Sequence, residues 1–236
     1  MSYYKILNLE HYFKMYKKSV LEPRKFWDKI AEENFTWYQK WDKVFDFDIE
    51  EAKFKWFVNA KVNITKNCID RHLSKRGEKT AIIFEPNDPS EESLHISYNE
   101  LYVRVSKMAN VLQEQGVKKG DRVCIYLPMI PELAIAVLAC ARIGAIHSVV
   151  FAGFSSSALA SRINDSDCKM VITSDGGFRG NKEIPLKAVI DDALTQCDTV
   201  QKVIVLNRTH TPVSMIKGRD VWWEEEMKLV NDLQLK

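Results

Sequence analysis

The strongest constraint on the fold is an alternation of short apolar runs with helix-like runs in the second half of the chain. The apolar runs "RVCIYLP", "IHSVVF", "KMVITS" and "KVIVL" are separated by "PELAIAVLACARIGA", "SSSALASRINDS" and "PLKAVIDDALTQC". Strands that are apolar on both faces are typical of a parallel sheet covered on both sides by helices. The pattern predicts a three-layer α/β fold with a mainly parallel sheet flanked by helices, and strands near 122–127, 146–151, 169–173 and 202–206.

Two further elements precede this repeat. The runs "AIIFE" and "LHISY" flank the polar, proline-bearing stretch "PNDPSEES", which predicts an antiparallel pair of strands. Ser97 and Glu100 then form a capping-box pattern at the start of a helix. The apolar stripe of this helix consists of Leu101, Val105, Met108 and Leu112.

The first 64 residues differ in composition from the rest of the chain, because aromatic side chains are interspersed with charged ones there. Helical stretches such as "PRKFWDKIAEEN" are short, so we expect residues 1–64 to form an aromatic-rich helical or irregular segment that wraps a larger body, residues 65–236. Aromatic rings bury large areas in any core, and this explanation is preferred to a ligand-stacking role. The rings concerned include Trp27, Trp37, Trp41, Trp56 and Phe57.

Composition and charge exclude several classes of protein. The 236 residues carry 34 basic and 32 acidic side chains, a balance that favours neither a nucleic-acid partner nor a membrane surface. The five cysteines are widely spaced without a C-x-x-C pair, so neither a disulfide framework nor a zinc site is expected, and no metal ligands are assigned. No signal-peptide core or spanning run is present in the sequence, and we expect a cytoplasmic protein.

Ligands of parallel α/β sheets bind beyond the carboxyl ends of the strands, where three loops qualify here. The loop "SDGGFRGNK" combines three glycines with Arg179 and Lys182, but it lacks the spacing and the hydroxyl of a P-loop. Its glycines and cations make a workable phosphate site, and a solvated basic loop is the alternative. In "FAGFSSS", Gly153 suits a tight turn and the serines suit a helix cap, with anion binding as a second role. The third loop is "LPMIP".

Other polar residues give no catalytic arrangement. His147 lies within a predicted strand and is interpreted as an interior histidine whose hydrogen bonds are satisfied. Asp191 and Asp192 are interpreted as part of a solvated helix face, because adjacent residues on a helix do not point the same way. No catalytic residues are therefore assigned within this chain.

The run from "GVKKGDRVCIYLPMIPELAIAVLACARIGAIHSVVFAGFS" to "SDGGFRGNK", with "NCIDRHL" before it and "GRDVWWEE" after it, resembles the AMP-forming acetyl-CoA synthetases of the adenylate-forming superfamily. The likeness extends over essentially the whole chain. It implies a ligase that joins acetate to coenzyme A in two steps: acetate and MgATP give acetyl-adenylate and pyrophosphate, and the thiol of coenzyme A then displaces AMP.

The resemblance also implies roles for particular residues. Phe151, Ala152 and Gly153, followed by Phe154 and Ser155, correspond to a family loop that lies beside the nucleotide of coenzyme A. Arg179 and Lys182 correspond to two family arginines that hold the 3′-phosphate and adenine end of that molecule. Ala152 stands where the family has glycine, and Lys182 lacks the planar fork of arginine, which puts an adenine contact through Lys182 in doubt.

The family's ATP loop, acetate pocket and C-terminal domain have no counterpart in this sequence. We therefore expect an N-terminal part of the ligase that supplies the coenzyme A nucleotide loops, is inactive alone, and needs the missing remainder of the chain to bind acetate, ATP and Mg²⁺. The alternative is a non-catalytic α/β module whose basic loop binds a phosphorylated metabolite or a protein partner.

Overall fold

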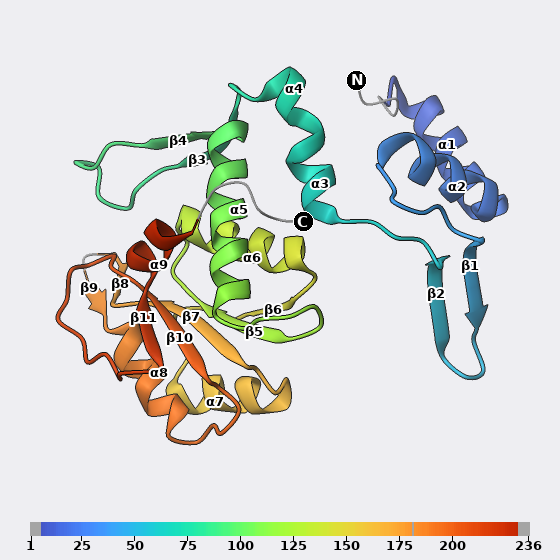
Figure 1. Ribbon diagram of the computed structural model, residues 1–236. Helices are drawn as coiled ribbons and strands as arrows, with labels where there is room; N and C mark the ends of the chain where they lie inside the picture. Colours follow the sequence, from blue (N-terminus) through green and yellow to red (C-terminus); the bar gives the residue numbers. More distant parts are fainter. Residues whose placement is uncertain (1–5, 181, 231–236) are drawn as a thin grey trace. The chain divides into compact units, whose positions relative to one another are not determined.

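The computed structural model describes residues 6–180 and 182–230, and the chain divides into two compact units, Met1–Asn67 and Cys68–Lys236. Figure 1 shows the elements of both units along the chain. Each unit is built around its own contacts.

The first unit contains two helices and an antiparallel hairpin. Its elements are α1 (Leu9–Leu21), α2 (Pro23–Asn34), β1 (Lys43–Asp48), β2 (Lys53–Val58) and the start of α3 (Ile64–Cys68). The hairpin lies within the segment expected to be helical or irregular, and it was not predicted. Its aromatic residues face one another across the strands, Phe45 opposite Trp56 and Phe47 opposite Phe54. Such cross-strand aromatic pairs stabilise a hairpin, which explains why this stretch adopts strands.

Two of the tryptophans in the first unit have internal hydrogen-bond partners. Trp37 Nε1 donates to the carbonyl oxygen of Ala31 at 2.9 Å, and Trp41 Nε1 donates to Asp28 Oδ1 at 2.8 Å. The two indole rings also pack on each other, with centroids 5.0 Å apart. A structural role for these rings agrees with the interpretation from the sequence.

The second unit contains the predicted parallel sheet. Its five strands lie in the order β11-β10-β7-β5-β6, and every neighbouring pair is parallel. Four of them confirm the predicted strands to within about two residues: β5 (Arg122–Tyr126), β6 (Ile146–Val149), β7 (Met170–Ser174) and β10 (Lys202–Leu206). The fifth, β11 (Asp220–Trp222), is short and was not predicted.

Helices cover both faces of this sheet, as Figure 1 shows. One buried cluster joins strand residues such as Ile125 and Ile172 to α5 (Tyr98–Glu114), α6 (Pro131–Ile143) and α9 (Trp223–Leu229). The other joins the alternate residues, such as Tyr126 and Val171, to α7 (Ser156–Asp165) and α8 (Leu186–Leu194). The three-layer α/β prediction is confirmed.

Several predicted boundaries also hold. Ser97 and Glu100 form both halves of the capping box that opens α5. Gly144 ends α6 with φ of +75°, the left-handed conformation that glycine adopts without strain. The predicted antiparallel pair consists of β3 (Thr80–Phe84) and β4 (Leu94–Ser97), and the shorter elements before it are η1 (Asp70–His72) and α4 (Leu73–Arg76).

The interpretations of His147 and of the basic loop are wrong. His147 is exposed, because β6 is an edge strand of the sheet rather than an interior one. The stretch interpreted as an open basic loop contains a small antiparallel hairpin, β8 (Gly177–Arg179) and β9 (Lys182–Ile184). Residue 181 lies outside the described residues.

Candidate functional site

The predicted site residues follow strands of one parallel sheet and therefore lie at the same edge. The loop 151–155 follows β6, and the β8–β9 hairpin follows β7, with β5 between the two strands. Neighbouring strands lie about 4.8 Å apart, so these two segments start roughly 10 Å from each other. The topology brings both predicted segments to the edge where ligands of such sheets bind.

The loop 151–155 is a tight turn held to the sheet below it. The backbone N–H of Phe154 donates to the carbonyl oxygen of Phe151 at 3.0 Å, and a Cβ on Gly153 would lie 2.6 Å from the Phe151 ring. Phe151 itself is 62% exposed, whereas Ala152 is half-buried and packs against the cluster under α7 and α8. The loop therefore presents an aromatic ring to solvent on a constrained backbone.

Two side chains fix this loop further. The buried Tyr126 donates its hydroxyl hydrogen to the carbonyl oxygen of Phe154 at 2.9 Å, and burial raises the pKa of Tyr126, which keeps this donor protonated. The guanidinium of Arg162 lies 4.7 Å from the centre of the Phe154 ring. Ser155 caps α7 by accepting from the N–H of Ala158, as the sequence predicts.

The β8–β9 hairpin places the two predicted cations directly opposite each other. Arg179 and Lys182 are paired in the register of the hairpin, and both side chains are exposed. Within residues 6–180 and 182–230 neither cation has an ion-pair partner, although many other basic side chains do. Gly180, between them in the chain, has φ of +59°. Two cations on a glycine-containing hairpin can together bind one phosphate group.

Contacts that the sequence did not reveal hold the hairpin in place. At its tip, Asn87 Nδ2 donates to the carbonyl oxygen of Gly180 at 3.2 Å. Along β9, the Thr211 hydroxyl donates to the carboxylate of Glu183. At its base lies Asp175, a fully buried carboxylate bonded to the loop that follows β10. The signal in the sequence for this role is an aspartate directly after a buried strand.

The buried thiols are not candidates for catalysis. Burial raises the pKa of Cys124 and of Cys168, and it raises that of Cys140 to about 12. Thiols with raised pKa values stay protonated and are poor nucleophiles. Cys68, by contrast, is exposed.

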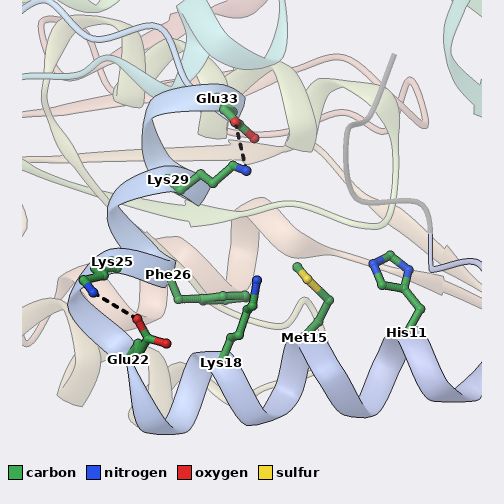
Figure 2. Close-up of a pocket in the computed structure, with 8 residues that line it drawn as sticks. All are labelled: His11, Met15, Lys18, Glu22, Lys25, Phe26, Lys29 and Glu33. Carbon is green, nitrogen blue, oxygen red and sulfur yellow. Dashed lines mark hydrogen bonds and ion pairs between the residues drawn. The ribbon is translucent and has the colours of Figure 1, made fainter.

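A hollow lies in the first unit, between α1 and α2. Figure 2 shows this cleft, with Met15 and Phe26 among its lining residues. Its volume is about 460 Å³. Two of its lysines are neutralised, Lys25 by Glu22 and Lys29 by Glu33. None of the predicted site residues lies there. Over the described ranges 6–180 and 182–230, no group of three or more His, Cys, Asp or Glu side chains is arranged to hold a metal ion. In those ranges, no helix is long and apolar enough to cross a membrane.

A parallel sheet covered by helices on both faces, with the turn 151–155 and the β8–β9 hairpin at the carboxyl ends of its strands, defines an open-sheet α/β protein. Comparison with known sequences makes the assignment specific. Residues 69–232 match the AMP-binding enzyme family, and the chain belongs to that family. Residues 12–68 match a second family, described as the acetyl-coenzyme A synthetase N-terminus.

Curated relatives agree with this assignment. The chain is 51% identical over 220 residues to acetyl-coenzyme A synthetase of Magnetococcus marinus, and 53% identical over 220 residues to that of Syntrophobacter fumaroxidans. Each alignment covers 93% of this chain and 34% of the relative. The chain thus corresponds to an N-terminal part of these enzymes and spans about a third of their length.

A solved structure has the same fold. Acetoacetyl-CoA synthetase from Streptomyces lividans superimposes with a TM-score of 0.82 at 23% sequence identity. The superposition covers 92% of this chain and 32% of that protein. At this identity the likeness supports the fold alone.

Proposed function

We propose that this chain contributes the coenzyme A nucleotide site of an acetate–CoA ligase, which converts acetate, ATP and coenzyme A to acetyl-CoA, AMP and pyrophosphate. The proposal assigns the nucleotide to Phe151, Ala152, Gly153, Arg179 and Lys182. ATP and Mg²⁺ belong, on this proposal, to parts of the ligase that this sequence does not contain. Residues 1–64 form an N-terminal segment, and residues 65–236 belong to the large α/β domain. The proposed location is the cytoplasm.

The observation that carries the proposal is the pair of cations on the β8–β9 hairpin. Arg179 and Lys182 are opposite each other, exposed, and without an acidic partner among the described residues. Unpaired cations held by a backbone hairpin are available to a phosphate. The less exposed cations Arg142, Lys187 and Arg219, by contrast, have carboxylate partners. The identity of about 50% to acetyl-coenzyme A synthetases then favours coenzyme A as the phosphate-bearing ligand.

The two proposed segments have complementary chemistry for a nucleotide. The exposed Phe151 ring offers an apolar surface on which a purine base can pack. The hairpin offers positive charge for the phosphate. Because only one strand separates the strands that carry them, one nucleotide can contact both segments.

The alternative function is a non-catalytic α/β module that binds another phosphorylated metabolite or a protein partner through the same hairpin. No feature of the hairpin distinguishes the 3′-phosphate of coenzyme A from other phosphates. A binding experiment with defined ligands separates the two functions.

We expect Arg179 to contribute more than Lys182, because its guanidinium forms two parallel bonds to a phosphate while an ammonium remains well hydrated. Calorimetric titration of the chain with coenzyme A tests this. Arg179→Ala is expected to raise the dissociation constant about tenfold or more, since a bond to a charged group contributes on the order of 1.5–3 kcal/mol. Lys182→Ala is expected to have a smaller effect.

Lys217→Ala is the matched control. Lys217 is an exposed cation in the turn before β11, at the opposite edge of the sheet. Equal affinities of the wild type, Arg179→Ala and Lys217→Ala for coenzyme A would refute the assignment of the hairpin.

A further inference from the structure

The position of the cationic hairpin depends on what surrounds it. Strands β8 and β9 have three residues each, and a two-stranded hairpin of this size is marginally stable by itself. Phe178, Arg179, Lys182 and Glu183 are all exposed, so the hairpin buries few side chains of its own. Its orientation must therefore come from contacts at its base and sides.

The most extensive of these contacts is made by Asp175, the residue after β7. Its side chain is fully buried and has no ion-pair partner within the described parts of the chain. Its carboxylate accepts hydrogen bonds from four backbone N–H groups: those of Gly176, Arg208, Thr209 and Thr211, at 2.7–3.1 Å. Three of these donors belong to the loop after β10.

The same loop packs directly against the hairpin. A Cβ on Gly176 would lie 2.5 Å from Thr209 Oγ1 and 3.3 Å from the carbonyl oxygen of Ile184. The loop and β9 therefore both pack closely against Gly176. The Thr211 hydroxyl donates to Glu183 on β9. Thr209 and Thr211 are also linked through their hydroxyls, 2.8 Å apart. These contacts form an unbroken series from Asp175 through residues 208–211 to β9.

The electrostatics favour an ionised Asp175. Burial acts to raise its pKa, but the four N–H donors together outweigh burial, and the net pKa is lowered. A neutral amide at this position presents only one acceptor oxygen, and its own N–H₂ group would face donors. Asp175→Asn therefore releases part of the 208–211 loop while changing the size of the side chain little.

We propose that Asp175 is a positioning residue for the coenzyme A nucleotide site: it fixes residues 208–211 against β9 and so sets where Arg179 and Lys182 lie. This inference rests on the proposed function. Asp175 touches no ligand in this account; it acts through the loop and the hairpin.

The test compares wild type, Asp175→Asn and Asp220→Asn at a temperature at which all three are folded. Asp220 is a second buried aspartate with lowered pKa. It lies at the amino ends of the parallel strands, whereas the hairpin lies at their carboxyl ends. Calorimetry gives the ratio of the dissociation constants for dephospho-coenzyme A and coenzyme A, which reports recognition of the 3′-phosphate. Amide hydrogen exchange reports protection of residues 208, 209 and 211.

We expect Asp175→Asn to lower this ratio about fivefold or more, because a binding group loses its geometry when its supporting shell is loosened. Exchange at residues 208, 209 and 211 is expected to accelerate, while the amides of β5 and β7 stay protected. Asp220→Asn is expected to keep the wild-type ratio even if its stability falls.

The outcomes separate the two claims. If wild type and folded Asp175→Asn discriminate equally well between the two ligands, the positioning role is refuted and the proposed function stands. The same holds if Asp220→Asn lowers the ratio as much as Asp175→Asn does. If wild type does not discriminate, the proposed function fails and the inference fails with it. Should Asp175→Asn not fold, Glu183→Ala decides: this exposed side chain releases the loop from β9 without altering the core, and an unchanged ratio refutes the inference.

Discussion

At the scale of single residues, the most unusual feature is a fully buried lysine. Lys187 Nζ lies 2.9 Å from Asp220, 2.7 Å from Asp191 and 2.9 Å from the carbonyl oxygen of Ser214. Arg219 joins the cluster through both aspartates. The sequence suggested that Asp191 belongs to a solvated helix face, and these contacts show that it does not. The lysine four residues before it on the same helix was the available signal.

Removal of one carboxylate from this cluster is expected to be costly. Asp220→Asn leaves Lys187 buried with one acidic partner fewer, and we expect the free energy of unfolding to fall by roughly 3 kcal/mol. Urea denaturation measures the loss. The double variant Asp220→Asn with Lys187→Met is expected to lose less than the single variant, because an apolar residue needs no charged partner. A double variant less stable than the single one would contradict this account of the cluster.

The same aspartate gives a pH dependence with a defined sign. Burial acts to raise the pKa of Asp220, but hydrogen bonds from Arg219, Lys187 and the N–H of Ile216 prevail, and the pKa is lowered. A lowered pKa in the folded state stabilises the protein above the unfolded value of about 3.9, and this stabilisation is lost as the pH falls below it. The stability difference between wild type and Asp220→Asn is thus expected to shrink from pH 6 to pH 3. A difference that grows over this range would be inconsistent with the assignment.

At the scale of elements, periodicity in the sequence was sufficient for long elements and insufficient for short ones. The apolar strands β5, β7 and β10 and the helices between them were predictable, because each carries its own pattern. Strands β8, β9 and β11 have three residues each, too few for a pattern, and β11 depends on pairing with β10. In β1 and β2 the alternation of aromatic and charged residues was present, but the density of aromatics obscured it.

The capping box of α5 permits a test at this scale. Ser97 Oγ accepts from the N–H of Glu100, and Glu100 accepts from the N–H of Ser97. Ser97→Ala removes one half of this exchange and is expected to lower the free energy of unfolding by about 1 kcal/mol. Thermal unfolding measures the effect, with Ser90→Ala, in the exposed loop between β3 and β4, as the control. Equal stability of the two variants would show that the cap contributes nothing.

At the scale of the whole molecule, the sequence indicates at which edge of the sheet the candidate site lies, but it does not indicate how that candidate site is supported. Arg179, Lys182 and the turn at Gly153 could be singled out, because glycines and cations after apolar strands have a recognisable chemistry. The contacts of Asp175, Tyr126 and Thr211 join segments far apart in the chain, which no local pattern reveals. The parts of the site that were missed are those that depend on tertiary structure.

The central claim is that the β8–β9 hairpin binds the 3′-phosphate of coenzyme A. The most direct measurement is the affinity of the wild type and Arg179→Ala for coenzyme A and for dephospho-coenzyme A, which lacks that phosphate. We predict that wild type prefers coenzyme A about tenfold or more, and that Arg179→Ala loses most of this preference while its affinity for dephospho-coenzyme A changes little. Equal discrimination by wild type and Arg179→Ala would show that the hairpin does not bind this phosphate.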